Sequence, residues 1–241
     1  MILIYKKKFI ILSVCLIFFV CGVMSFFYGI KTATLILREE IIVIDAGHGG
    51  IDGGVSGTIT KAKESDLNLK YAISLKNVFE KQGYRIVLTR STEDGLYGTA
   101  AAYLNEDSRK SQDMKRRKEI INQAEPVCVL SVHMNFFGKS SARGAQVFYN
   151  SSNPESKRLA TAVQNKINNL NEEYVGRKIT QLPGDYYIVK SIEYPSCIVE
   201  CGFLSNPEDE KLLLNADYRE RLVYEIGNGV LMYLKTRELQ S

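Results

Sequence analysis

The chain contains only two histidines, and both stand where a side chain could bind a metal ion. His48 follows the apolar run at residues 41–44 after three residues, and His133 directly follows the largely apolar run at residues 127–132. Short runs rich in β-branched residues predict buried strands. Side chains just past the carboxyl end of such strands face the crevice where α/β proteins bind ligands. One histidine in this place is more often structural, but two in equivalent places predict a shared site.

A catalytic zinc ion needs a third protein ligand and leaves one position for water, and two histidines with one carboxylate form a known set. Glu64 begins a predicted helix, where an acidic residue is also explained by the helix dipole. Glu200 ends an apolar run, where a carboxylate is costly to bury unless it is paired or lies near a cation. A nucleophilic Cys201 is an alternative that would need a base. The carboxylates near strand ends or the glycine-rich segment are Asp45, Asp52, Glu64, Asp66 and Glu200.

The remaining pattern predicts the elements that hold these residues. Strands and helices alternate, which favours a single layered α/β domain. The predicted strands are residues 41–45, 84–89, 127–132, 144–149, 187–189 and 197–200. The predicted helices are residues 65–82, 114–124, 154–169 and 217–234, with a long polar loop at residues 92–113.

The N-terminus carries a second signal. Phe9–Ile30 is an uncharged run of 22 residues that follows Lys6, Lys7 and Lys8. A membrane-spanning helix needs about 20 apolar residues, and basic residues before it predict a cytoplasmic N-terminus with the rest exported. The apolar core of a cleaved signal peptide usually has only about 7–15 residues. We therefore expect residues 1–30 to be a retained anchor, with a cleaved signal as the alternative, and residues 31–39 to be a linker.

Net charge excludes a nucleic-acid binding surface. Lys and Arg total 31 against 27 Asp and Glu, a net charge of +4. The three N-terminal lysines supply three of these, which leaves 28 against 27, or +1, for the rest of the chain. No dense basic stripe with interleaved aromatic residues is present, so we expect no nucleic-acid partner.

Four motifs in register resemble those of the zinc-dependent N-acetylmuramoyl-L-alanine amidases, the amidase-3 group of cell-wall hydrolases. The motifs are DAGHGG at residues 45–50, Glu64 with DLN at residues 66–68, SVHMN at residues 131–135 and ECGFLSN at residues 200–206. The resemblance covers roughly residues 40–235. It implies a twisted, mostly parallel sheet of about six strands flanked by helices, and a catalytic domain at residues 40–237.

The resemblance also implies roles for individual residues. Zinc would be held by His48, Glu64 and His133, and Glu200 would be the catalytic carboxylate. The reaction would cleave the amide between the lactyl group of muramic acid and L-alanine in peptidoglycan. Asn135 and Arg117 are further candidates for orienting the substrate.

Within the group, the short exported domain and the TRSTEDGL segment at residues 89–96 look like the CwlD-type amidases of spore formers. This implies action on spore-cortex peptidoglycan, in the forespore intermembrane space, as a step toward the muramic-δ-lactam needed for germination. Two alternatives stay open: a zinc peptidase or carboxypeptidase that cuts within the stem peptide, and a non-catalytic wall-binding protein. A site with only two nitrogen ligands and a long polar segment nearby also predicts that the isolated domain binds zinc weakly and needs an activating protein partner or a membrane context for full activity.

Overall fold

The computed structural model describes residues 16–25, 40–98 and 105–239, which belong to two separate units, Met1–Glu39 and Glu40–Ser241. In the first unit, residues 16–25 are helical and their side chains are exposed. The rest of the predicted apolar segment Phe9–Ile30 and the linker at residues 31–39 lie outside the described residues. Among the described helices, none is long and apolar enough to cross a membrane.

The second unit is built on a six-stranded sheet with the order β2-β1-β3-β6-β4-β5. Strands β2, β1, β3 and β6 are parallel, β4 is antiparallel to β6, and β5 is parallel to β4. The predicted α/β fold with a mostly parallel sheet is therefore confirmed. The strands are β1 (Ile41–Ala46), β2 (Arg85–Leu88), β3 (Cys128–Asn135), β4 (Gln146–Tyr149), β5 (Leu182–Pro183) and β6 (Ser196–Phe203).

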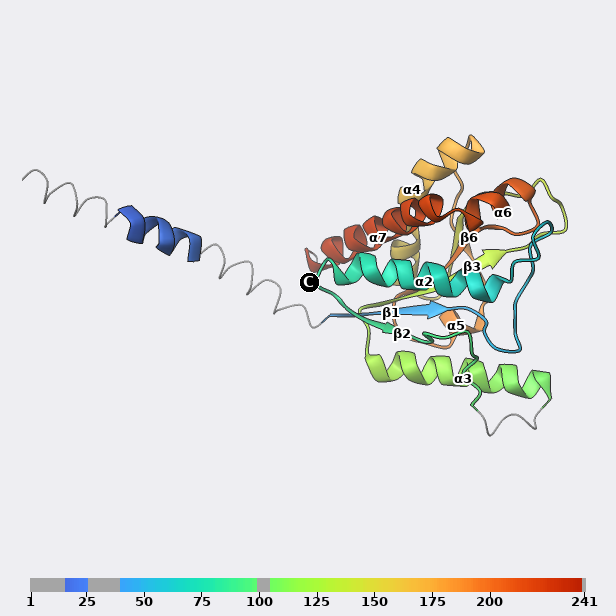
Figure 1. Ribbon diagram of the computed structural model, residues 1–241. Helices are drawn as coiled ribbons and strands as arrows, with labels where there is room; N and C mark the ends of the chain where they lie inside the picture. The colour runs from blue at the N-terminus through green and yellow to red at the C-terminus, as the bar shows by residue number, and fades with distance from the viewer. Residues whose placement is uncertain (1–15, 26–39, 99–104, 240–241) are drawn as a thin grey trace, which may run out of the picture. The chain divides into compact units, whose positions relative to one another are not determined.

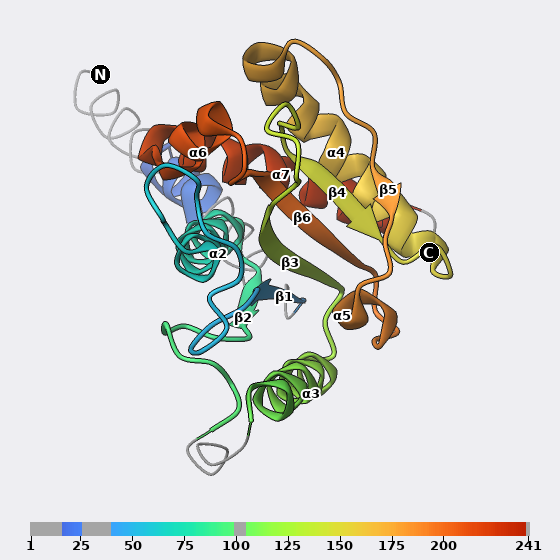
Figure 2. The same cartoon turned by 90° about the vertical axis from the view of Figure 1, so that its right-hand side faces the viewer.

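Helices cover both faces of this sheet (Figures 1 and 2). One face is covered by α2 (Glu64–Glu80), α4 (Pro154–Val175), α6 (Pro207–Leu214) and α7 (Ala216–Glu238). The other face carries α3 (Glu106–Ala124) and the short α5 (Tyr187–Lys190). The two layers of helices are unequal, so the second face is less completely covered than the first.

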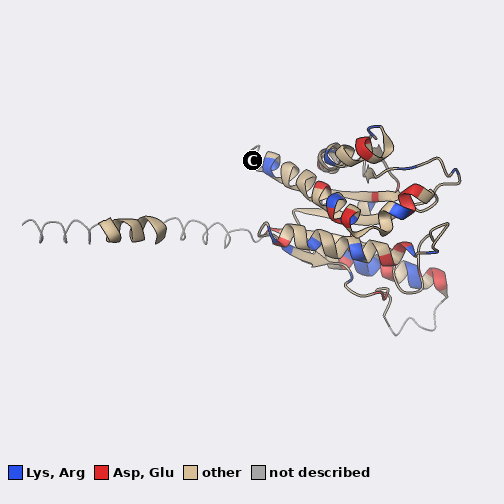
Figure 3. Cartoon of the chain, turned by 45° about the horizontal axis from the view of Figure 1, so that its top comes forward, with Lys and Arg blue, Asp and Glu red and all other residues tan. Residues whose placement is uncertain are grey.

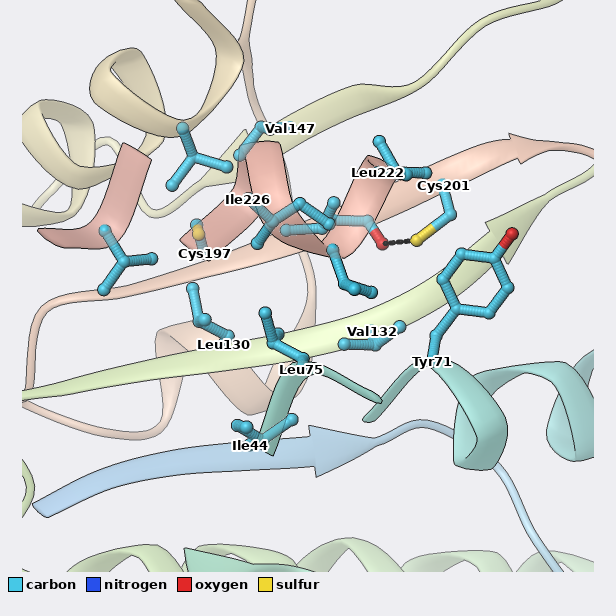
Figure 4. Packing of buried hydrophobic residues seen from close by; sticks show 14 of the residues in the cluster. Ile44, Tyr71, Leu75, Leu130, Val132, Val147, Cys197, Cys201, Leu222 and Ile226 are labelled. Carbon is cyan, nitrogen blue, oxygen red and sulfur yellow. Dashed lines mark hydrogen bonds between the residues drawn. The ribbon is translucent and has the colours of Figure 1, made fainter. Parts of the chain in front are cut away.

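Side chains alternate between two hydrophobic cores because successive residues of a strand point to opposite faces. Leu130 and Val199 join the larger core beneath α2, α4 and α7 (Figure 4). Val129 and Ile198, one residue before each, join the smaller core beneath α3 and α5. The same alternation places His133 and Glu200 on the face of the smaller core, beyond its last apolar residues.

The structure corrects three expectations. Helix α3 begins at Glu106, within the predicted loop, and Asn105 caps it by accepting a bond from Ser108 N at 2.9 Å. Only three of its residues are buried, so its first turns lack the apolar periodicity that would have revealed them. Tyr187–Val189 is helical and not a strand, and the sixth strand is instead β5. Helix α6 was missed, although Asn206 followed by Pro207 is a common helix start.

Strand register brings the chemically interesting residues to one edge of the sheet. Ala46 lies beside Val132 across the β1–β3 ladder, and His133 lies beside Glu200 across the β3–β6 ladder. The carboxyl ends of these three parallel strands therefore meet at a single place. Helix α2 begins at the same edge with Glu64, after the glycine-rich loop that follows β1.

Candidate metal centre and active site

The three predicted metal ligands come together at this edge of the sheet. His48, Glu64 and His133 each offer a ligand atom, and these atoms all lie within 4.8 Å of one another. Oε1 of Glu64 lies 3.2 Å from Nε2 of His48 and 2.9 Å from Nδ1 of His133. The Glu64 side chain is buried, whereas both rings are partly exposed. The cluster is thus open to substrate from the side of the histidines.

Two glycines make this close arrangement sterically possible. A Cβ atom on Gly47 would lie 2.2 Å from the ring of His133, and one on Gly54 would lie 2.4 Å from Oε2 of Glu64. Each side chain is therefore seated directly against backbone, which restricts its rotation. This explains why the loop between β1 and α2 is rich in glycine.

The electrostatics favour a positive charge at the centre of the cluster. Burial by itself lowers the pKa of His48, but Asp52 and Glu64 outweigh it and raise that pKa to about 9. Burial by itself raises the pKa of Glu64, but hydrogen bonds and charge interactions with the two histidines hold it well below its usual range. Two imidazoles and one ionised carboxylate, packed against Gly47 and Gly54, form a ligand set that fits a zinc ion.

Asp52 contacts His48 from outside the three-residue cluster. Its Oδ2 lies 2.8 Å from Nδ1 of His48, on the side of the ring away from Glu64. Such a carboxylate fixes the tautomer and orientation of a ligating histidine. Asp52 was among the carboxylates that the sequence singled out, and the structure places it next to a ligand candidate.

Glu200 stands beside the cluster in a different environment. It is 7% exposed, and its Oε2 has no hydrogen-bond partner among the described residues. Burial raises the pKa of this carboxyl to about 7, with His133 acting against the rise. A buried carboxyl with a pKa near neutrality can both accept and release a proton at neutral pH.

Comparison with known proteins gives the family. A family model described as N-acetylmuramoyl-L-alanine amidase matches residues 42–232. The chain belongs to this family. The resemblance drawn from the four motifs is thereby confirmed for nearly the whole second unit of this amidase-family chain.

Individual relatives are similar over most of the chain. The germination-specific N-acetylmuramoyl-L-alanine amidase of Bacillus subtilis is 31% identical over 203 residues, which cover 84% of this chain and 83% of the relative. The CwlD amidase from Clostridioides difficile, solved in complex with the GerS lipoprotein, has 32% identity and a TM-score of 0.76. That match covers 82% of this chain and 99% of the other. A second amidase, from Clostridium difficile 630, has 27% identity, a TM-score of 0.70 and coverage of 83% and 99%.

Two buried arginines hold the loop that carries His48 in this amidase-family domain. Arg117 donates to the carbonyl oxygens of Ala46 at 2.7 Å and His48 at 2.6 Å. Arg90 donates to the carbonyl oxygens of Ala46 and Gly47, both at 2.9 Å. His48 has a φ angle of 59°, in the left-handed region that non-glycine residues rarely adopt. The arginines therefore stabilise a strained backbone that aims His48 at the cluster.

Asp45 completes this support. It is 1% exposed and accepts bonds from Arg117 at 2.6 Å, Thr89 at 2.7 Å and Ser131 at 2.5 Å. Burial alone raises the pKa of Asp45, but Arg117, Ser131 and Thr89 outweigh it and lower that pKa to about 2. Arg117 also donates from Nε to Asp113 at 2.5 Å. Asp45 and Asp113 thus both pair with the buried guanidinium of Arg117.

The other predicted residues occupy distinct places. Arg117 lines the wall of the cleft, and every bond that its guanidinium makes goes to the chain itself. Asn135 ends β3 beside the histidine, and its Oδ1 accepts a bond from Phe136 N at 2.8 Å. Cys201 is fully buried on the opposite face of β6 from Glu200, with its thiol directed at Val199 O (Figure 4). Burial raises the pKa of this thiol, which disfavours the thiolate that a nucleophile requires.

Arg90 is a functional residue that the sequence analysis missed. It directly follows the predicted strand at residues 84–89, in the same relation to its strand that drew attention to the histidines. The same rule of strand ends would therefore have found it. A cleft of about 140 Å³ opens beside the histidines, between the glycine-rich loop, α3 and α5, and gives a substrate access to this edge.

Proposed function

We propose that the chain is a zinc-dependent N-acetylmuramoyl-L-alanine amidase that acts on peptidoglycan. It cleaves the amide between the lactyl group of N-acetylmuramic acid and L-alanine of the stem peptide. The observation that carries the proposal is the meeting of His48, Glu64 and His133 with Glu200 on the neighbouring strand, whose Oε2 has no hydrogen-bond partner among the described residues.

The residues divide the chemistry between them. His48, Glu64 and His133 would hold zinc, which when bound polarises a carbonyl and makes water acidic enough to ionise near neutral pH. Glu200 takes a proton from the attacking water as its oxygen bonds to the lactyl carbonyl carbon. When the carbon–nitrogen bond breaks, Glu200 returns this proton to the departing amine. The products are a lactyl carboxylate and a free amino terminus on L-alanine.

We also propose a place and a biological role. Similarity to the germination-specific amidase of Bacillus subtilis and to the CwlD amidase supports action on spore-cortex peptidoglycan. The apolar segment at residues 9–30 supports export across the cytoplasmic membrane, with the chain anchored or secreted, and the cortex role points to the forespore intermembrane space. Because the CwlD structure is a complex with the GerS lipoprotein, we propose that this chain also takes an activating protein partner.

The test uses the purified full chain on peptidoglycan, with and without added zinc, followed by mass spectrometry of the new ends. We expect zinc-dependent release of peptides with free L-alanine amino termini, leaving muramic acid without peptide. The Glu200→Ala variant should bind zinc and release none. Products that keep L-alanine on muramic acid would instead identify a peptidase, and zinc binding without any cleavage would contradict hydrolysis by the chain alone.

A further inference from the structure

A second depression lies on the far side of Glu200 from the histidines. Its volume is about 320 Å³, and three of its nine lining residues are basic while none is acidic. We call it the basic groove, and it is lined by Ala142, Arg143, Gln146, Arg177, Lys178, Ile179, Thr180, Leu182 and Phe203. Elsewhere charges of both signs are interspersed over the helices, as the view in Figure 3 illustrates.

The basic groove begins one strand away from Glu200. Gln146 of β4 lies directly opposite Glu200 in the antiparallel β4–β6 ladder. Residues directly opposite each other in such a ladder project from the same face, with Cβ atoms about 4.5–5.5 Å apart. Gln146 extends further along the sheet, since its Nε2 donates to Thr180 O at 2.8 Å. A ligand held beside Glu200 can therefore continue into the groove without leaving the sheet face.

Buried contacts fix the backbone that presents the cations. Asn168 of α4 accepts a bond from Ile179 N at 2.9 Å and donates to Ile179 O at 3.0 Å. Ile179 follows Arg177 and Lys178 directly, so these two side chains emerge from an anchored segment. On the other wall, Nε of Arg143 lies 3.4 Å from the buried Asp209.

Of the three cations of the basic groove, Arg143 and Lys178 each approach one carboxylate, and Arg177 supplies the charge that is left uncompensated among the described residues. Arg177 is exposed and makes no ion pair with any residue that the structure describes. Lys178 is 68% exposed at its side chain and approaches only Glu172, at 3.7 Å. Between the cations lie the exposed Leu182 and the partly exposed Phe203. The groove thus combines an apolar floor with a basic rim, which suits a peptide that carries carboxylates.

We propose that the basic groove binds the acidic stem peptide on the side of the departing L-alanine, through the free α-carboxylate of its γ-linked glutamate. The inference rests on the proposed function, because a carboxyl that protonates the departing amine must lie at the start of the departing peptide. The peptide therefore runs from Glu200 past Gln146 toward Arg177 and Lys178. Its glutamate carboxylate follows L-alanine by one residue.

The test measures binding of a product peptide and needs no bond cleavage. The probe is the tripeptide L-alanyl-γ-D-glutamyl-L-lysine, called the acidic form, and the comparison peptide is its form with an amidated glutamate α-carboxyl, which lacks that one negative charge. Calorimetry compares both on the zinc-loaded full chain, on Arg177→Gln and on Arg85→Gln. Arg85 is an exposed arginine on β2, at the opposite edge of the sheet, and serves as the matched control.

We expect the acidic tripeptide to bind the wild-type chain more tightly than the amidated form, with a preference that weakens as salt screens the exposed charges. Arg177→Gln should weaken binding of the acidic form about two- to fivefold, the range for an exposed ion pair. It should leave the amidated form unchanged. Addition of Lys178→Gln should weaken binding of the acidic form further, and Arg85→Gln should have no effect.

Three results would overturn the proposal. These are equal binding of the two peptides, absence of measurable binding, and an equal loss in Arg85→Gln, which would show general attraction to a basic protein. Failure of the amidase reaction is a separate outcome. A chain that cleaves nothing but still prefers the acidic tripeptide keeps the groove assignment, and one that cleaves peptidoglycan without this preference loses only the groove.

Discussion

The loop at residues 46–48 and the strand end at Glu200 stand on either side of β3 at the same edge of the sheet, but they are built in opposite ways. All three carbonyl groups of the loop accept bonds from Arg117 or Arg90. The Oε2 atom of Glu200 is buried and accepts none from the described residues. Burying an unsatisfied polar group costs about 1–3 kcal/mol. The burial of Glu200 Oε2 without a donor therefore lowers stability, and this loss calls for a functional reason.

Under the proposed function, the two regions meet two separate requirements of one reaction. A metal ligand must keep its position, so the loop is stabilised by many bonds, including those that maintain the strained backbone of His48. A carboxyl that carries a proton must be able to change its charge. Burial keeps the pKa of Glu200 close to neutrality, whereas a donor to its Oε2 atom would stabilise the carboxylate and lower that pKa.

The largest effect is expected at Glu200. Glu200→Gln keeps the shape of the side chain but removes its ability to accept a proton, so kcat/KM for peptidoglycan should fall by about 10²–10⁴. The zinc affinity of the variant, measured by titration, should be unchanged. A variant that loses zinc along with activity would contradict the separation of the two regions.

Removal of the buried cation should come next. Arg117→Met leaves the buried carboxylate of Asp45 without its charge partner, and the free energy of unfolding should fall by about 3–5 kcal/mol. Urea unfolding of the zinc-free protein measures this directly. Arg116→Met is the matched control, because Arg116 is exposed and pairs only with Glu119. Its stability should change by about 0.5 kcal/mol or less, and equal losses in both variants would disprove the bracing role of Arg117.

The third prediction concerns the contact between Asp52 and Nδ1 of His48. Asp52→Asn weakens the interaction with Nδ1 of His48, and the zinc affinity should fall about 10- to 100-fold, as is usual for such a carboxylate. Competition with a chromogenic chelator measures the affinity. Asp66→Asn is the control, since Asp66 lies in the first turn of the same helix as Glu64 and contacts neither histidine. Unchanged affinity in Asp52→Asn would show that His48 does not depend on this carboxylate.

The smallest effect concerns pH. Burial raises the pKa of Glu200 to about 7, and its ionised form is the one that accepts the proton, so activity should fall as pH falls through this pKa. A bound cation nearby lowers the pKa. The acidic limb of the kcat/KM profile should therefore lie between the ordinary glutamate value of about 4.3 and about 7. A limb below the ordinary value would mean that Glu200 is stabilised as a carboxylate.

Much of the fold and the candidate site could be predicted from local patterns. Short runs rich in β-branched residues predicted β1, β3 and β6. Both histidines and Glu200 stand at or just beyond the ends of these runs. Helix α3 was only half predicted, because its first turns are charged and exposed. Met134 lies in the larger core because strand alternation turns it away from His133, a placement that the motif around the histidine did not reveal.

The sequence by itself determined which residue types are available and where along the chain they stand: two histidines, Glu64 and Glu200 at the ends of predicted elements, and the glycines between them. Only the tertiary structure decided what those residues touch. It showed that Arg117, a substrate candidate from the sequence, braces the backbone of His48, 69 residues away in sequence. It also assembled the basic groove from three separated segments of the chain. The physical reason is that these contacts depend on how helices pack against a completed sheet, and a local pattern of residues carries no information about partners that distant.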